Sequence, residues 1–98
     1  MWCLYLIRAK GDMLYTGITK NISRRFYQHN KGRGAKCLRA SKGALQLAYV
    51  TPSTYTYRQV ARAEYKLKRK PKKFKEWVVS TQPRDIVQII LMNDNDSV

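Results

Sequence analysis

Apolar residues form short continuous runs in the first half of the chain and recur at helical spacing in the second half. The runs at 2–8 and 13–18 flank the turn signal KGD at 10–12, and together they predict a β-hairpin. The run at 44–50 has the length and pattern of a third strand. Helices are predicted between the hairpin and this strand, and twice after it, over 22–30, from Thr54 or Thr56 to about 70, and over 72–80.

Individual residues mark where these elements begin and end. Asn21 is a good N-cap for the first helix, and Thr19 is the alternative if that helix begins earlier. Pro71 ends the second helix and suits the first turn of the third. The segment 31–43 combines three glycines with several Lys and Arg residues and is predicted to be an irregular basic loop. The apolar run at 85–92 is compatible with a fourth strand or with a packed tail.

The order strand, strand, helix, strand, helix, helix indicates a small α/β fold. Short strands in this order favour a three-stranded mixed or antiparallel sheet flanked by helices. A chain of 98 residues is long enough for one hydrophobic core and too short for two. We therefore predict a main domain over residues 1–82 and expect 83–98, an apolar segment with an acidic tail, to pack on the same domain.

The chain is strongly basic, because 20 Lys and Arg residues against 6 Asp and Glu residues leave a net charge of +14. Such a surplus attracts polyanions, and nucleic acid is the leading candidate partner. A hydrophobic content of 44% and an aromatic content of 11% exclude a disordered basic tail. A structural RNA-binding protein would carry the same charge, so charge alone does not select a function.

A membrane partner is not predicted. No stretch approaches the ~18 apolar residues of a transmembrane helix, and there is no lipidation signal. The N-terminal segment has neither the basic region nor the cleavage site of a signal peptide. Cys3 and Cys37 lack metal-ligand spacing and are expected to be free thiols in a reducing compartment. We expect a cytoplasmic protein, and leave open whether it has a protein partner.

The first predicted helix directs two polar side chains toward its apolar face. Arg25 and His29 are four residues apart, close to the face that Ile22 and Phe26 present to a core. Arg25 is suited to hold a phosphate, and His29 to move a proton or donate a hydrogen bond. The structural alternative is that Arg25 extends past Phe26 to solvent while His29 caps the end of the helix.

The hairpin and the second predicted helix supply further candidates. Tyr5 and Tyr15 lie on neighbouring strands, so their phenols are expected close together, although tyrosine is also an ordinary strand residue. Gly17 allows the backbone to pass close to a ligand, or serves only a turn. Glu64 falls on a stripe shared with Val60, Ala61 and Leu67, where a carboxylate needs a cation or an ion pair with Lys68 or Arg25.

These residues together resemble the GIY-YIG nuclease superfamily, and most closely its small single-domain UPF0213 branch, the YhbQ-like proteins. CLY at 3–5 corresponds to the first motif and YTG at 15–17 to the second. The branch pattern Y-x-G-x-T-x-x-[LI]-x-x-R-x-x-x-H then places Thr19, Ile22, Arg25 and His29, and the segments HNKGRGAKCLR and AEYKLKR match at 29–39 and 63–69. The resemblance covers roughly residues 2–80.

The resemblance implies the roles of the site residues. Tyr5 and Tyr15 would lie at the site, Arg25 would bind the phosphate, His29 would transfer a proton or position another group, and Glu64 would bind one Mg²⁺ or Mn²⁺ ion. Cys3 and Thr16 replace a glycine and an isoleucine of the family motifs, at backbone or packing positions.

We therefore predict a metal-dependent endonuclease that hydrolyses phosphodiester bonds in nucleic acid, with DNA favoured and with structure-selective or nonspecific cleavage. The general base is Tyr5 or, as the weaker candidate, His29. Flanking phosphates would be bound by basic residues of the loop and the second helix, Arg33, Lys36, Arg39, Lys42, Lys68 and Arg69. The alternative is a nucleic-acid-binding module on the same fold that is inactive or requires a partner.

Overall fold

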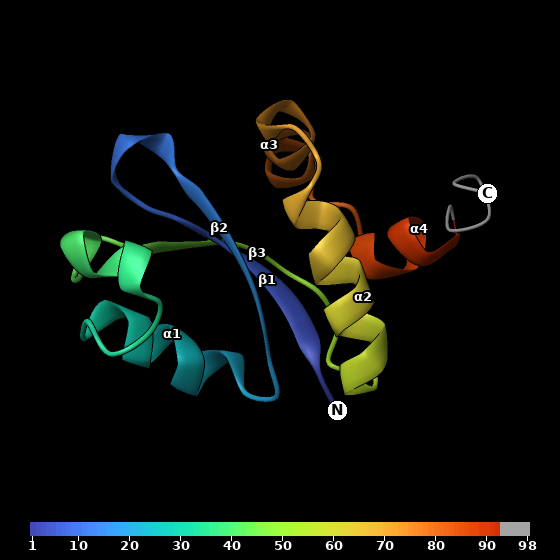
Figure 1. Cartoon of the computed structure of the whole chain (residues 1–98), viewed down its shortest axis with the longest axis horizontal. Helices are drawn as coiled ribbons and strands as arrows, with labels where there is room; N and C mark the ends of the chain where they lie inside the picture. The colour runs from blue at the N-terminus through green and yellow to red at the C-terminus, as the bar shows by residue number, and fades with distance from the viewer. Residues whose placement is uncertain (93–98) are drawn as a thin grey trace.

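The computed structural model describes residues 1–92 as a three-stranded sheet packed between helices (Figure 1). The strands are β1 (Cys3–Arg8), β2 (Leu14–Thr19) and β3 (Gln46–Val50), arranged in the order β2-β1-β3. Strand β1 pairs antiparallel with both of its neighbours. The predicted α/β class and three-stranded sheet are confirmed, and of the two predicted arrangements the sheet is the antiparallel one.

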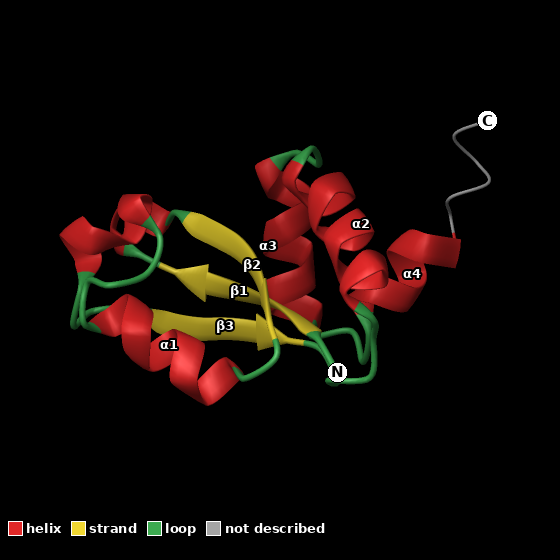
Figure 2. Ribbon diagram, turned by 60° about the horizontal axis from the view of Figure 1, so that its bottom comes forward, coloured by secondary structure: helices red, strands yellow, loops and turns green. Residues whose placement is uncertain are grey.

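Helices cover both faces of this sheet (Figure 2). The elements are α1 (Ile22–Asn30), α2 (Tyr57–Lys68), α3 (Lys72–Thr81), α4 (Ile86–Met92) and the 3-10 helices η1 (Lys10–Asp12) and η2 (Lys36–Ser41). Helix α1 and η2 pack on one face, and α2, α3 and α4 pack on the other. Within residues 1–92, no helix is both long enough and apolar enough to cross a membrane.

Strand β1 is buried because it contributes to both layers of the core. Leu4 and Leu6 belong to the larger apolar cluster beneath α2, α3 and α4. Tyr5 and Ile7 point to the opposite face and belong to the smaller cluster beneath α1 and η2. A strand covered on both faces reads as a continuous apolar run, which is the pattern of residues 2–8 in the sequence.

Helix boundaries follow the predicted capping residues. The Asn21 side chain accepts a hydrogen bond from the Arg24 backbone N–H at 3.0 Å, so the N-cap of α1 is confirmed. Helix α2 begins with a capping box between Thr56 and Gln59. Pro71 is the N-cap of α3, which agrees with the predicted break at that proline.

The basic segment 31–43 is more ordered than predicted. It contains η2, in which Leu38 and Ser41 are buried. Leu38 anchors the segment because its side chain inserts into the cluster beneath α1. A single apolar residue among glycines and cations gives no periodic signal, so the prediction of an irregular loop was wrong over the six residues of η2.

The apolar run at 85–92 forms helix α4 rather than a fourth strand. Ile86, Val87 and Ile90 are buried in the larger core cluster, which also contains residues of α2. A run of eight residues fits a strand or a helix equally well by pattern, and contact with α2 selects the helix. The predicted acidic tail lies outside the described residues.

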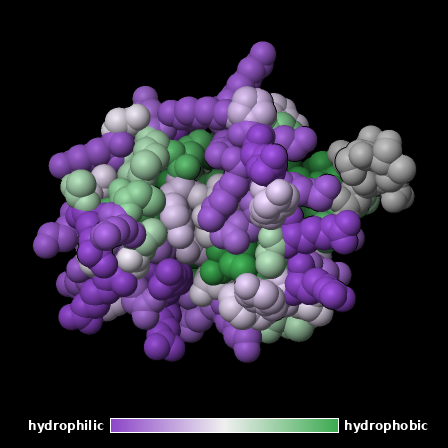
Figure 3. All heavy atoms as spheres, in the orientation of Figure 1, coloured by the Kyte–Doolittle hydropathy of each residue, from purple (hydrophilic) through white to green (hydrophobic). Residues whose placement is uncertain are grey.

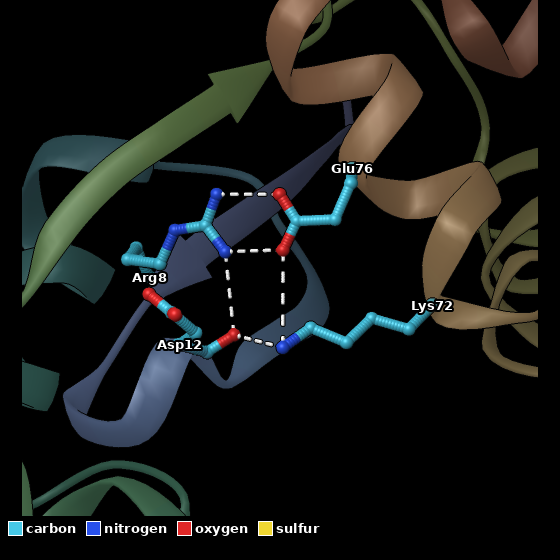
Figure 4. Close-up of polar contacts among 4 residues, drawn as sticks. All are labelled: Arg8, Asp12, Lys72 and Glu76. Carbon is cyan, nitrogen blue, oxygen red and sulfur yellow. Dashed lines mark hydrogen bonds and ion pairs between the residues drawn. The ribbon is translucent and has the colours of Figure 1, made fainter.

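An ion-pair cluster fastens α3 to the hairpin (Figure 4). The Arg8 guanidinium donates two hydrogen bonds to the Glu76 carboxylate, at 2.6 and 2.7 Å. Lys72 donates to the Asp12 backbone carbonyl at 2.6 Å and lies 3.8 Å from Glu76. The Arg8 hydrogen bonds lower the pKa of Glu76, and Glu76 in turn raises the pKa of Arg8. This pairing joins residues that are 68 positions apart in the sequence.

Candidate active site

The two hairpin tyrosines meet on the face of the sheet that α1 covers. Their ring centroids are 6.3 Å apart, as expected for phenols on neighbouring strands. Gly17 lies directly opposite Tyr5 in the β1–β2 ladder. A Cβ atom at Gly17 would overlap the Tyr5 phenol. Glycine is required here because the aromatic side chain packs on its backbone, and not merely because a turn follows.

His29 is completely buried beside these tyrosines. Its Nε2 lies 2.9 Å from the Tyr5 hydroxyl, and its Nδ1 accepts a hydrogen bond from the Ala35 backbone N–H at 3.2 Å. The Tyr15 ring meets the imidazole edge-on, with centroids 5.5 Å apart. Because Nδ1 is an acceptor, the proton of the neutral ring is on Nε2, which donates to Tyr5. His29 therefore positions the phenol, and does not cap the helix end.

The protonation states of this pair follow from burial. Burial and the neighbouring Arg25 charge lower the pKa of His29, which favours the neutral imidazole. Burial raises the pKa of Tyr5 to about 12, although Arg25 acts in the opposite direction. Tyr5 is thus a neutral phenol at pH 7 in the free protein.

Gly34 and Ala35 complete the His29 environment and were not singled out from the sequence. A Cβ atom at Gly34 would overlap the imidazole ring, so this position accepts only glycine while the ring stays in place. Ala35 then supplies the backbone N–H that fixes the tautomer. The signal in the sequence for this contact was the pair of glycines that flank Arg33, because a glycine is required where a side chain packs closely on the backbone.

Arg25 is half-buried on α1, with His29 one turn further along the same helix. Its guanidinium donates to the Gln28 side-chain oxygen at 3.2 Å. It also lies close enough to Tyr5 to lower the pKa of the phenol through a hydrogen bond and through its charge. A half-buried cation beside the phenol is suited to bind a phosphate oxygen.

Glu64 approaches the same region from α2. The buried stripe of this helix is Val60, Ala63 and Leu67, so the predicted stripe containing Ala61 and Glu64 is displaced by part of a turn. The Glu64 side chain is 22% exposed and lies 3.4 Å from Lys68. Glu64 therefore lies at the border of the apolar face. Its carboxylate forms an ion pair with Lys68, which is one of the two ion pairs that the sequence analysis gave as the alternative to a bound cation.

Helix α2 reaches the tyrosines across strand β2. The Lys68 ammonium lies 5.9 Å from the centroid of the Tyr15 ring. The charge of Glu64 is one of the smaller influences that raise the pKa of Tyr5. The candidate site residues therefore lie around β2 and come from three parts of the fold, the hairpin, α1 and α2. They are Tyr5, Tyr15, Arg25, His29 and Glu64.

The donor set around Glu64 suits a cation that keeps most of its water. Within residues 1–92, no three His, Cys, Asp or Glu side chains lie close enough to form a metal cage. Mg²⁺ is commonly bound by one or two carboxylates together with waters and phosphate oxygens. A single, accessible carboxylate fits that chemistry and does not fit a closed zinc site.

Exposed cations surround this region. Arg33, Lys36, Arg39 and Lys42 are exposed on and beside η2, and Lys68 and Arg69 are exposed at the end of α2. Figure 3 shows hydrophilic side chains over α1 and over α2, with a paler strip between them where β2 lies. The predicted basic residues therefore lie on both sides of β2, available to a polyanion.

Thr16 occupies the isoleucine position of the second motif and is buried on β2. Its hydroxyl has no hydrogen-bond partner in the part of the chain that the structure describes.

The two cysteines, Cys3 and Cys37, are both free, the first buried and the second exposed.

Comparison with known proteins places the chain in a family. The model of the GIY-YIG catalytic domain matches residues 1–76. The UPF0213 protein ORF82 of Orgyia pseudotsugata multicapsid polyhedrosis virus is 45% identical over 91 residues, which cover 92% of this chain and 86% of that protein. The UPF0213 protein YhbQ of Escherichia coli O127:H6 is 49% identical over 80 residues, which cover 81% of this chain and 77% of that protein.

A UPF0213 protein of Cronobacter sakazakii is 47% identical over 79 residues, which cover 81% of each chain. No solved structure gives a significant match. A match of the catalytic-domain model over residues 1–76, together with relatives of this identity and coverage, shows that the chain belongs to the GIY-YIG family, among its UPF0213 members.

Proposed function

We propose that the protein is a divalent-metal-dependent endonuclease that hydrolyses phosphodiester bonds in nucleic acid, with DNA as the favoured substrate. The GIY-YIG catalytic domain implies a nuclease-type function and an interaction with nucleic acid. The observation that carries the proposal is the convergence of Tyr5, Arg25 and Glu64 on strand β2 from three elements. The net charge of +14 supports a polyanionic substrate.

Each residue has a role that its surroundings support. Arg25 would bind a non-bridging oxygen of the scissile phosphate and stabilise the charge that develops there. Glu64 would hold Mg²⁺ or Mn²⁺, which when bound supplies Lewis-acid stabilisation of the phosphate and the leaving oxygen. Lys68 must then release Glu64, and as an exposed lysine it can turn to a flanking phosphate.

Tyr5 is the better candidate for the general base because both ring nitrogens of His29 are already engaged. With a pKa near 12, the phenol must lose its proton to solvent as the substrate site assembles. The Nε2–H of His29 and the Arg25 guanidinium would stabilise the resulting phenolate. The phenolate would then take a proton from the attacking water, while Tyr15 orients that water.

The test is a time course on supercoiled, linear, branched and single-stranded DNA with Mg²⁺, Mn²⁺ or EDTA. Glu64→Gln should lower the cleavage rate by about 100-fold or more, because the metal-holding charge is lost while the side-chain shape is kept. Asp12→Asn makes the same change of charge on the hairpin turn and should cleave normally.

Two outcomes would contradict the proposal. Normal cleavage by Glu64→Gln would remove the metal role from this residue. Binding of DNA without cleavage under any metal would favour a nucleic-acid-binding module that is inactive or depends on a partner.

A further inference from the structure

A groove of about 390 Å³ lies where the end of β2 and the start of α1 meet the N-terminal segment. Its walls include Trp2, Ile18, Lys20, Arg24, Arg25 and Gln28. In both ribbon views the loop from β2 to α1 lies beside the N-terminus (Figures 1 and 2). The volume is within the range of sites that hold a small ligand.

The groove is positively charged. Lys20, Arg24 and Arg25 line it, and none of its lining residues is acidic. Within residues 1–92, Lys20 and Arg24 form no ion pair. Unpaired cations in a concave surface concentrate anions, so the charge of the groove is complementary to a phosphate group.

The groove also offers an aromatic wall. Trp2 is half-buried, and its ring meets Tyr57 edge-on with centroids 5.0 Å apart. The Lys20 ammonium lies 5.7 Å from the centroid of the Trp2 ring. An aromatic ring next to cations is the combination by which proteins bind the base and the phosphate of one nucleotide.

Arg25 connects this groove to the candidate active site. The residue lines the groove, and it lies one helical turn before His29, whose Nε2 is 2.9 Å from the Tyr5 hydroxyl. A nucleic-acid strand whose phosphate is bound by Arg25 would therefore pass beside the groove.

We infer that the groove is a nucleotide subsite, in which one unpaired nucleotide stacks its base on Trp2 and places its outer phosphate between Lys20 and Arg24. The inference rests on the proposed function for the position of the scissile phosphate, but the binding itself requires no cleavage. A base inside a duplex is covered by its neighbours, so the subsite selects nucleic acid with an unpaired nucleotide beside the cleaved bond.

The experiment uses tryptophan fluorescence in the presence of EDTA. The chain has two tryptophans, so Trp77→Phe leaves Trp2 as the single tryptophan, and excitation at a wavelength that tyrosine does not absorb makes its emission the only signal. This protein is titrated with a short oligothymidylate and with an oligonucleotide of equal length made of abasic sites. Oligothymidylate should quench Trp2 and bind about tenfold more tightly than the abasic oligonucleotide, which should bind without quenching.

Two further variants sharpen the result. In Trp2→Phe the emission of Trp77, which lies on α3, should not respond to either oligonucleotide. Lys20→Ala should weaken the binding of both oligonucleotides to a similar extent, because it removes a phosphate contact and leaves the ring.

The inference is overturned if both oligonucleotides quench Trp2 equally, or if oligothymidylate binds to saturation, as followed by anisotropy, without quenching Trp2. Neither result depends on catalysis. A failure of the proposed function would instead show itself as unchanged cleavage in Glu64→Gln or as no cleavage in any metal.

Discussion

His29 is the residue whose surroundings most restrict its chemistry. Tyr5 and the Ala35 backbone occupy its two ring nitrogens, and Gly34 leaves room for the ring. Protonation of Nδ1 would place two donors face to face and break the contact with Ala35. The neutral ring is therefore part of the folded structure.

This predicts a pH-dependent stability. The pKa of His29 is lowered on folding by burial and by Arg25, so below its unfolded value of 6.5 the unfolded chain takes up a proton first. The free energy of unfolding should fall as the pH is lowered from about 7 to 5.5, by at most about 1.4 kcal/mol per pH unit for one proton. Urea unfolding at several pH values measures this slope.

The control is His29→Gln, which keeps a donor for Tyr5 but does not titrate. His29 is the single histidine of the chain, so the slope should disappear in this variant. The same slope in both proteins, or a flat profile for the wild type, would show that His29 is not held neutral.

At the scale of elements, helix α4 contributes buried side chains to the larger core cluster. It lies beyond residues 1–76, which the family model matches, yet Ile86, Val87 and Ile90 are buried with residues of α2. Helix α2 also carries Glu64, so α4 supports the element that presents the candidate metal ligand.

Neighbouring isoleucines on α4 provide a matched test. Ile90 is 5% exposed and Ile89 is 37% exposed. Ile90→Ala should lower the free energy of unfolding by about 2–5 kcal/mol because it leaves a cavity beneath α2. Ile89→Ala makes the same change of helix propensity and should cost about 0.5 kcal/mol or less. Equal effects in urea unfolding would mean that α4 does not pack in this way.

Most elements of this fold were predictable from local pattern. The hairpin, α1 with its Asn21 cap, and the break at Pro71 each carry a signal within a few residues. The helix η2 and the state of α4 were not predictable, because single buried residues and an eight-residue apolar run contain no decisive period.

At the scale of the whole molecule, charge controls the encounter with a polyanion. The net charge of the chain is +14, and exposed cations lie on both sides of β2. The ion-pair cluster of Arg8, Lys72 and Glu76 uses part of this charge to hold α3 to the hairpin. The exposed cations on and beside η2, Arg33, Lys36, Arg39 and Lys42, lie outside this cluster and are proposed to bind phosphates.

Binding to duplex DNA should therefore weaken steeply with salt. Each neutralised phosphate adds about 0.9 to the slope of log K against log salt concentration. Lys36→Ala should reduce that slope by about 0.9, because Lys36 belongs to the proposed phosphate-binding set. Arg84→Ala, an equal loss of charge at an exposed residue between α3 and α4, should leave the slope unchanged. A flat salt dependence of the wild type, measured by fluorescence anisotropy, would contradict the polyanion argument.

The sequence by itself determined the α/β class, the hairpin, the capping residues and the membership of Tyr5, Tyr15, Arg25, His29 and Glu64 in one spaced motif. These features depend on neighbours along the chain or on residue order, which a sequence displays directly. Only the tertiary structure decided the tautomer of His29, the helical state of α4 and the groove beside Arg25. Each of these depends on contacts between segments that no local window contains, such as the Tyr5 hydroxyl bonded to a ring 24 residues away.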